Sequence, residues 1–212
     1  MKIYDLTLTI SPELVVWEGD APIEIERTSR LEKGDEYNLS SLKMSVHAGT
    51  HVDAPCHFLP EGKGVDRLNP DDLSGPASVI DLRGHNRINR DILDGLSLPD
   101  SVRRMILLTD NTERNILHSA SFVRDFVALD ETAADWVVER RIRLIGIDSL
   151  SVAPYGFSFQ THATLLKADV IIVEGLDLQD VKAGLYELTV MPLKIRDCDG
   201  APARVMLKDR LQ

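Results

Sequence analysis

The chain is poor in cysteine and has no long apolar run or low-complexity tract. Its 212 residues include two cysteines, Cys56 and Cys198, so reduced thiols are the expectation, although the sequence alone leaves a bridge open. No stretch of about eighteen consecutive apolar residues occurs, so no membrane-spanning helix is predicted. Linkers rich in proline, glycine or serine are also missing, and we expect one domain over residues 1–212.

Positive charge is scarce as well. Lysine and arginine number 24 against 34 aspartate and glutamate residues, which gives a net charge of −10. This balance argues against a phosphate-binding role, and no basic cluster interleaved with aromatic residues opposes it. Residues 1–20 lack a basic start followed by a long apolar run. We therefore expect a cytoplasmic protein that acts on a small-molecule substrate, with no nucleic-acid or membrane partner.

Apolar runs of strand length recur along the chain and predict a strand-rich domain. With 43% hydrophobic residues, the chain can fill a core. The expected strands are Ile3–Ile10, Leu42–His47, Ser78–Leu82, Met105–Thr109, Leu144–Asp148, Val170–Glu174, Leu188–Ile195 and Arg204–Leu207.

Helical signals are fewer. Asp130 stands in an N-cap position before residues 131–141, which carry acidic residues early and arginines late, as the helix dipole favours. Shorter helices are expected over Ser121–Ala128 and Thr161–Lys167. The order strand, helix, strand from Met105 to Asp148 fits a crossover unit. These patterns predict a mixed α/β fold with more strand than helix.

Four side chains of the metal-ligand type lie in the segment His47-Ala48-Gly49-Thr50-His51-Val52-Asp53-Ala54-Pro55-Cys56-His57. Neutral imidazole and carboxylate are ligands of catalytic Zn²⁺ and Mn²⁺ sites. The four candidate ligands are separated by even numbers of residues, so an extended chain would turn all of their side chains to one face. They are His47, His51, Asp53 and His57. The alternative is a histidine-rich surface loop in which the aspartate caps a turn.

A straight strand cannot bring these side chains to one ion. His47 and His51 would lie roughly 13 Å apart in an extended chain, so the backbone must bend between them. Gly49 permits the unusual φ of such a bend, and Pro55 resists regular pairing before His57. We therefore predict a strand that enters a bent loop. Cys56 has the opposite parity and is expected to pack behind the loop as a small hydrophobe.

Further ligands are sought among the remaining histidines and the strand-end acids. His85 lies in a turn-like setting and is expected to be solvated, whereas His118 suits a structural or pocket-lining role. His162 opens a short helical stretch, and Glu174 ends an apolar strand just before a glycine. A carboxylate there needs a partner, which is either a metal ion or nearby backbone amides.

The segment from His47 to His57 resembles the H-x-G-T-H-x-D-x-P-x-H motif of a cyclase family that includes bacterial kynurenine formamidases and other metal-dependent amide, ester and lactone hydrolases. The resemblance runs almost end to end. It takes in Tyr4-Asp5-Leu6-Thr7, Trp17-Glu18-Gly19-Asp20, residues 145–151, Glu174-Gly175-Leu176, Pro192-Leu193 and Gly200-Ala201-Pro202-Ala203-Arg204. It implies the swivelling β/β/α fold of that family.

The resemblance also implies roles for individual residues. The first two motif histidines and the motif aspartate bind metal in the family, and a later histidine and a glutamate twelve residues on complete a second metal site. The corresponding metal ligands here are His47, His51, Asp53, His162 and Glu174. The last motif histidine transfers protons, which implies that role for His57.

An early tryptophan contacts the aromatic substrate in the kynurenine formamidases, and Trp17 stands in its place, although it would equally suit a loop anchor or a subunit interface. Trp136, on the expected helix, is assigned to the core. Arg204 suits either a substrate carboxylate or a nearby acid.

Two departures from the family pattern concern the substrate. Glu18 replaces a proline of many relatives, and Ala153-Pro154-Tyr155 replaces an Asp-Pro pattern.

The expected activity is hydrolysis of a small amide or formamide by metal-activated water, with N-formylkynurenine as the leading substrate. An ester or lactone hydrolase, or a metal-dependent cyclase or dehydratase, is the alternative, and a non-catalytic metal or small-molecule binder is the second. One or two divalent ions per chain are expected, zinc before manganese, because these ligands suit both metals. Relatives imply a homodimer or homotetramer.

Overall fold

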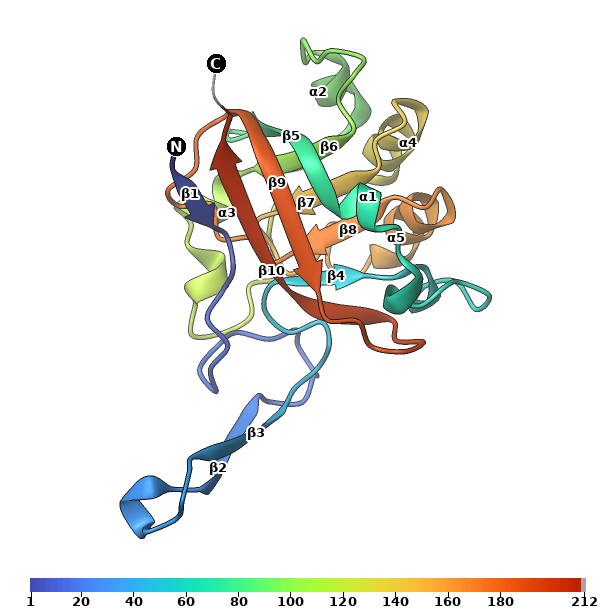
Figure 1. Cartoon of the computed structure of the whole chain (residues 1–212). Helices are drawn as coiled ribbons and strands as arrows, with labels where there is room; N and C mark the ends of the chain where they lie inside the picture. The colour runs from blue at the N-terminus through green and yellow to red at the C-terminus, as the bar shows by residue number, and fades with distance from the viewer. Residues whose placement is uncertain (211–212) are drawn as a thin grey trace.

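The computed structural model describes residues 1–210 and contains a closed barrel of seven strands (Figure 1). The barrel strands pair in the order β10-β4-β8-β7-β6-β5-β9, and β9 pairs with β10 to close the ring, while β1 extends the sheet from β10. The strands are β1 (Ile3–Asp5), β2 (Glu24–Ser29), β3 (Leu39–Lys43), β4 (His51–Asp53), β5 (Ser74–Asp81), β6 (Arg104–Leu108), β7 (Leu144–Ile147), β8 (Ile171–Glu174), β9 (Gly184–Pro192) and β10 (Gly200–Asp209).

Short helices lie between the strands. The α-helices are α1 (Pro70–Leu73), α2 (Arg90–Asp94), α3 (Asp110–Glu113), α4 (Glu131–Glu139) and α5 (Ser158–Lys167), and single 3-10 turns cover η1 (Leu31–Lys33), η2 (Pro55–His57), η3 (Val65–Arg67) and η4 (Ile116–His118). The side chain of Asp130 accepts from the backbone N–H groups of Thr132 and Ala133, which confirms the expected cap of α4. In the described part of the chain, no helix is long and apolar enough to cross a bilayer.

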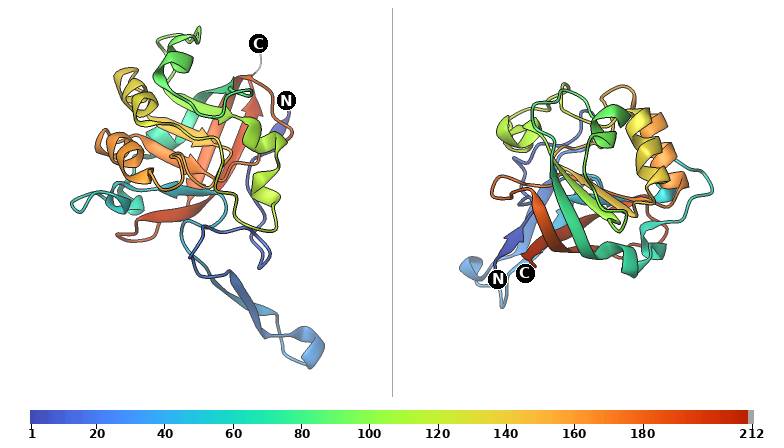
Figure 2. Two further views of the ribbon diagram at one scale, coloured as in Figure 1. Left: turned by 180° about the vertical axis from the view of Figure 1, so that it is seen from behind. Right: turned by 90° about the horizontal axis from the view of Figure 1, so that it is seen from above.

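Half of the barrel is parallel, as the crossover pattern predicts. Strands β5, β6, β7 and β8 run parallel to one another, and the helices that connect the later pairs, α4 and α5, lie side by side on the outer face (Figure 2). The strand, helix, strand unit from Met105 to Asp148 is thus confirmed as β6, α4 and β7.

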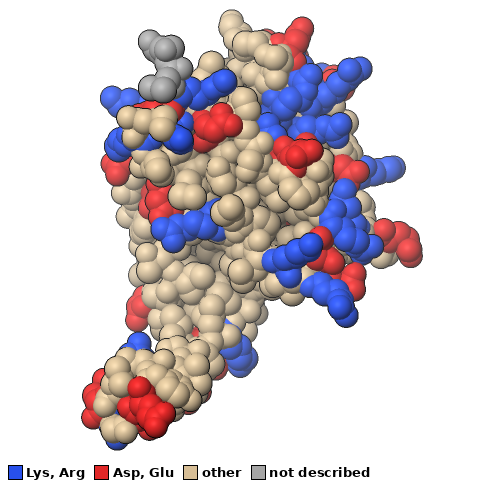
Figure 3. Space-filling model, in the orientation of Figure 1, with Lys and Arg blue, Asp and Glu red and all other residues tan. Residues whose placement is uncertain are grey.

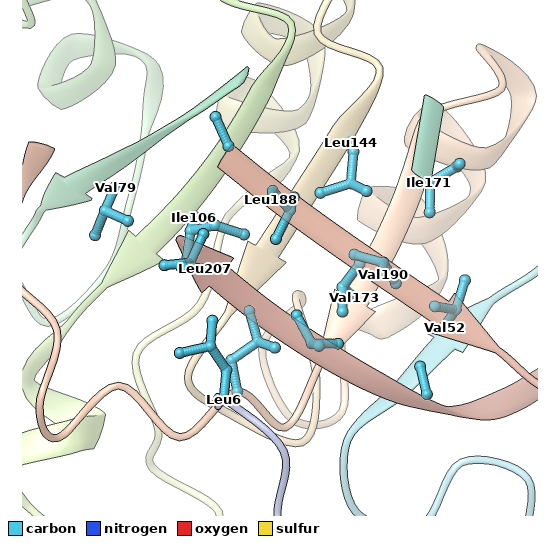
Figure 4. Close-up of a cluster of buried hydrophobic side chains, with 14 of the residues drawn as sticks. Leu6, Val52, Val79, Ile106, Leu144, Ile171, Val173, Leu188, Val190 and Leu207 are labelled. Carbon is cyan, nitrogen blue, oxygen red and sulfur yellow. The ribbon is translucent and has the colours of Figure 1, made fainter. Parts of the chain in front are cut away.

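Two hydrophobic cores lie on opposite faces of the parallel strands. Ile106 points into the barrel with Val79, Val173 and Leu188 (Figure 4). Its neighbour Met105 points outward, into a second core between the sheet and helices α2, α4 and α5. Because both faces are covered, these strands read as continuous apolar runs. Trp136 lies in the outer core, as expected, and its indole Nε1 donates to Asp94 at 2.7 Å.

Several sequence expectations are wrong. Residues 121–128 form no helix, and the helical turns precede them as α3 and η4, because Thr109 rather than Ser121 supplies the N-cap. The first strand ends at Asp5 instead of Ile10. The strand expected over Leu42–His47 ends at Lys43, and residues 46–50 form turns. Strand β2 has no counterpart among the expected strands.

Strands β2 and β3 form an antiparallel hairpin that stands away from the barrel (Figures 1 and 3). We call residues 24–43 the arm. Every residue of β3 is exposed, and β2 is exposed apart from its partly buried last residue. The exposed apolar side chains of the arm include Ile25, Leu31, Leu39 and Leu42. The arm leaves the barrel beside the end that carries the candidate site, since residues 17 and 47, on its two flanks, both line the same cavity.

Candidate metal centre

The motif segment crosses the barrel wall as a turn followed by a short strand. His47 lies in the turn, His51 and Asp53 lie on β4, and His57 ends the 3-10 turn η2. Gly49 has a φ of +70°, which supplies the predicted bend. The predicted order is wrong, because the bent segment precedes the strand rather than following it. The bend still brings His47 and His51 together, with ring centroids 5.1 Å apart.

The pairing of β4 brings distant residues to the motif. Strand β4 runs antiparallel to β8, and His51 lies opposite Glu174 in the register. On its other edge, Asp53 lies opposite Gly200 at the start of β10. A Cβ at Gly200 would lie 2.7 Å from Cε1 of His47, so only glycine leaves room for that ring.

Helix α5 supplies the remaining imidazole. His162 lies in the second turn of this helix, which begins at Ser158, earlier than the sequence predicts. Its Nε2 lies 3.2 Å from Oε1 of Glu174 and 3.6 Å from Oδ2 of Asp53. The ring of Phe58 stacks on it with centroids 4.4 Å apart. The structure therefore brings all five predicted ligands, His47, His51, Asp53, His162 and Glu174, to one end of the barrel.

These five residues form two ligand groups that share Asp53. The first contains His47, His51 and Asp53, and the second contains Asp53, His162 and Glu174; in each, the candidate ligand atoms lie within 4.8 Å of one another. Among the described residues, Oδ2 of Asp53 is a buried side-chain oxygen without a hydrogen-bond partner. A buried carboxylate oxygen that lacks a donor is costly, and a cation would satisfy it. The residues present thus fit a bound divalent metal ion.

Burial and charge together explain the titration of this cluster. Burial raises the pKa of Asp53, but hydrogen bonds from His47 and His51 outweigh it and hold that pKa well below its usual range. Burial also raises the pKa of Glu174, and His162 and His51 lower it overall. For His51, burial lowers the pKa, whereas Asp53 and Glu174 raise it to about 10. A metal ion that binds here therefore competes with protons.

His57 lies beside this cluster at a more open position. Its ring stacks on that of His47 with centroids 4.0 Å apart and an interplanar angle of 26°, and 30% of its side chain is exposed. Burial lowers the pKa of His57, so the imidazole is neutral at pH 7. A neutral, partly exposed imidazole can accept a proton. His57 also belongs to a third ligand-like group, with His47 and Asp199.

A cavity of about 450 Å³ opens above the cluster. Its lining residues are Trp17, Asp20, Ser45, His47, His51, His57, Phe58, Leu150, Ser151, Ser158, His162, Glu174 and Asp199. The cavity has the size of a small-molecule site and combines aromatic walls with a convergent polar floor.

Trp17 forms part of the cavity wall and also anchors its own loop. Its ring lies 4.7 Å from that of Phe122 and 5.6 Å from that of Tyr155, measured between centroids. The neighbouring Glu18 accepts from the hydroxyl of Tyr155 at 2.7 Å and from Arg124 Nη2 at 2.6 Å. The two departures from the family pattern, at Glu18 and Tyr155, thus contact each other and hold the Trp17 loop.

Asp199 and Phe58 are among the lining residues that sequence reasoning missed, and their side chains contact predicted metal ligands. Asp199 accepts from Nε2 of His47 at 2.9 Å, and Phe58 stacks on His162. Their positions in the sequence could have indicated them, because Asp199 directly precedes the Gly200–Arg204 segment and Phe58 directly follows His57.

The remaining sequence candidates lie elsewhere. His85 is exposed, as expected, and His118 pairs with Asp177 at 3.0 Å, outside the lining of the 450 Å³ cavity. Cys56 is half-buried against the barrel core, as its parity predicts, and both cysteines are free thiols. Arg204 pairs with Asp5, with Nε 3.0 Å from Oδ1, so the nearby acid is its partner.

Comparison with known proteins agrees with this architecture. A family model described as "Putative cyclase" matches residues 4–154. Cyclase-like protein 3 of Arabidopsis thaliana is 36% identical over 97% of this chain and 79% of its own length. A kynurenine formamidase of Erythrobacter litoralis is 32% identical over 98% of this chain and 94% of its own length.

A solved structure described as a potential metal-dependent hydrolase with cyclase activity superposes with a TM-score of 0.85. It is 34% identical in sequence, and the match covers 100% of this chain and 99% of the other. The expected strand-rich α/β fold and the resemblance stated from the motif are both confirmed. The chain belongs to this cyclase family.

Proposed function

We propose that this chain is a metal-dependent hydrolase that cleaves an amide bond of a small substrate. The observation that carries this proposal is the pair of ligand groups that share the buried Asp53, at the floor of a 450 Å³ cavity. The similarity to a kynurenine formamidase over nearly the whole length of both chains supports an amide substrate.

The metal ions would be held by His47, His51 and Asp53 and by Asp53, His162 and Glu174. A divalent ion bound there supplies Lewis-acid chemistry, because it lowers the pKa of water from about 15.7 toward about 7 and polarises a carbonyl. Zinc is the first choice and manganese the second, with one or two ions per chain. The backbone carbonyls of Gly49 and Ser158 accept Nδ1–H of His51 and His162, at 3.0 and 2.7 Å, which leaves Nε2 of each ring free to bind.

His57 is assigned the transfer of the proton. Its Nδ1 lies 3.6 Å from Asp199, and its Nε2 is the nitrogen left to accept a proton from the attacking water. The same nitrogen then returns this proton to the amine as the C–N bond breaks, so that the products are the amine and a carboxylic acid, which releases the second proton of the water to solvent as it ionises. The lowered pKa of His57 keeps the ring neutral before the reaction.

The leading substrate is an aromatic formamide, with N-formylkynurenine as the first candidate. The wall formed by Trp17 and the aromatic rings behind it supports a planar substrate, because such rings stack favourably. Esters and lactones present the same carbonyl to the same groups and form the comparison panel.

The deciding experiment measures metal content and hydrolysis of N-formylkynurenine, aryl amides, esters and lactones, on the wild type and on His51→Ala. One or two ions per chain in the wild type, with turnover lost in the variant, would support a metallohydrolase. Products that lack an added water would indicate a cyclase or dehydratase instead. Full metal loading without turnover of any substrate would indicate a non-catalytic metal or small-molecule binding protein.

We also propose a homodimer or homotetramer in the cytoplasm. The exposed leucines Leu31, Leu39 and Leu42 of the arm support self-association, since a two-stranded hairpin alone is marginally stable in water. Light scattering coupled to size exclusion tests the assembly.

A further inference from the structure

The three imidazoles assigned to metal binding share one arrangement. In each ring, one nitrogen faces the carboxylates of the cluster and the other contacts a protein oxygen. For His51 and His162 that oxygen is the backbone carbonyl of Gly49 or Ser158. For His47 the oxygen is Oδ2 of Asp199, at 2.9 Å from Nε2, while Nδ1 lies 2.9 Å from Oδ1 of Asp53. A fixed outer hydrogen bond sets which nitrogen of a histidine can bind metal.

Asp199 is itself held in place by the barrel. Its backbone carbonyl accepts from the amide of Ala54 at 2.8 Å, next to the ligand Asp53. The following residue, Gly200, gives His47 room to approach the start of β10. The carboxylate therefore projects from a fixed backbone, although 46% of the side chain is exposed.

The same oxygen atom faces the second histidine. Oδ2 of Asp199 lies 2.9 Å from Nε2 of His47 and 3.6 Å from Nδ1 of His57. The two rings stack 4.0 Å apart, so the carboxylate lies beside both members of one stacked pair. The contact with His57 is longer than a hydrogen bond, as such contacts commonly are before a substrate binds.

We propose that Asp199 is a positioning residue that acts on two histidines through this one oxygen. It accepts the Nε2 proton of His47, which presents Nδ1 to the metal ion, and it orients His57 so that Nε2 is turned to the substrate. Asp199 touches neither metal nor substrate in this role. The second half of the inference rests on the proposed function, and the first half rests on metal binding alone.

The test compares Asp199→Ala and Asp199→Asn with the wild type in two measurements. Zinc affinity and stoichiometry are measured by competition with a chromophoric chelator, without substrate. Turnover of the best panel substrate is then measured at saturating zinc. For Asp199→Ala we expect the zinc dissociation constant to rise about 10–100-fold with unchanged stoichiometry, as for the loss of other outer-shell partners.

At saturating zinc, kcat of Asp199→Ala is expected to stay at least about tenfold low with KM unchanged, because His57 is still misplaced. Asp199→Asn keeps an acceptor oxygen for His47 and should recover most of the lost zinc affinity. Asp197→Asn is the matched control, because it removes a carboxylate of the same loop that pairs with Arg67, away from the histidines. This control should behave as the wild type in both measurements.

Three results would overturn the proposal. Unchanged zinc affinity in Asp199→Ala would reduce Asp199 to a surface carboxylate. A lost zinc ion would make it a metal ligand together with His47 and His57. Full recovery of kcat at saturating zinc would exclude any action on His57. If the wild type binds zinc but hydrolyses nothing, the proposed function fails, while the zinc affinities and stoichiometries still decide whether Asp199 positions His47.

Discussion

Strands β3 and β4 follow each other in the chain but differ completely in their exposure to solvent. Residues 44–50 are all that separates them. Strand β3 contains Leu39 and Leu42 and is exposed at every residue, whereas β4 contains His51 and Asp53 and is buried at every residue. Hydrophobicity alone would predict the reverse.

The difference lies in the partners of the two strands. Strand β3 pairs with β2 only, and the exposure of nearly every residue of the two strands shows that no other described element packs on either face of the hairpin. Strand β4 pairs with β8 and β10, which are more than a hundred residues away, and these strands supply Glu174 and Gly200. Buried ionisable groups are tolerated when they are paired or bind metal. The polarity of β4 is therefore compensated by distant residues, whereas the apolar arm has no such partners within residues 1–210.

The largest effect is expected from Asp53→Asn. This substitution removes the anionic ligand that both groups share, so metal content should fall below one ion per chain and turnover should drop to background. Asp148→Asn is the matched control, because Asp148 is also fully buried but accepts from Thr109 and Thr112. The control should lower the thermal midpoint and keep the metal, as measured by calorimetry and elemental analysis. Equal metal loss in both variants would mean that Asp53 has no special role.

A smaller loss is expected from His57→Ala. The proposed proton transfer predicts that turnover falls about 10²–10⁴-fold while the metal content stays near that of the wild type. Steady-state kinetics and elemental analysis of the same samples check this. Metal loss in step with activity would make His57 a ligand rather than a proton carrier.

The pH dependence of metal binding is expected to distinguish the buried His51 from exposed histidines outside the site. In the metal-free protein the pKa of His51 is raised to about 10, so this ring is protonated at pH 7 and must lose its proton when metal binds. Zinc affinity should therefore rise by about tenfold per pH unit between pH 6 and pH 8 for each proton displaced. Chelator competition at several pH values measures the slope. His118→Gln, which removes an exposed histidine outside the site, should leave it unchanged.

Metal-free protein should show the opposite trend in stability. The folded-state pKa of His51 lies above its ordinary value of 6.5, so the stability that its proton contributes is fully present below about pH 6.5 and is lost as the pH rises toward about 10. Chemical unfolding of the metal-free protein between pH 6 and pH 10 measures this. A stability that rises across that range would contradict the assigned charge of His51.

The smallest effect on the site is expected from changes to the arm. Leu39→Ser with Leu42→Ser removes two exposed apolar side chains and should weaken self-association without changing metal content. Ile3→Ser with Leu185→Ser is the matched control, because both residues are exposed to a similar degree outside the arm, on β1 and β9. Light scattering reports the assembly. A monomeric wild type would refute the proposed role of the arm.

Much of the parallel half of the barrel could be predicted from the sequence because its strands are largely continuous apolar runs. Strands β5 to β8 lie within a few residues of their predicted positions, since burial on both faces demands apolar residues throughout. The exposed strand β2 carries no such signal and was missed. The helix expected over Ser121–Ala128 is wrong because these residues instead pack as irregular chain, with Phe126 and Ala128 buried.

The sequence by itself determined the ligand types, their spacing and the need for a bend at Gly49, because these depend on residue chemistry and on local backbone geometry. The register that sets Glu174 opposite His51, and the packing of α5 that brings His162 to Asp53 and Glu174, were decided by the tertiary structure. So was the contact of Asp199 with His47, which spans 152 residues. Side chains so far apart in the chain meet only when the barrel closes, and no local pattern records which strand becomes the neighbour of which.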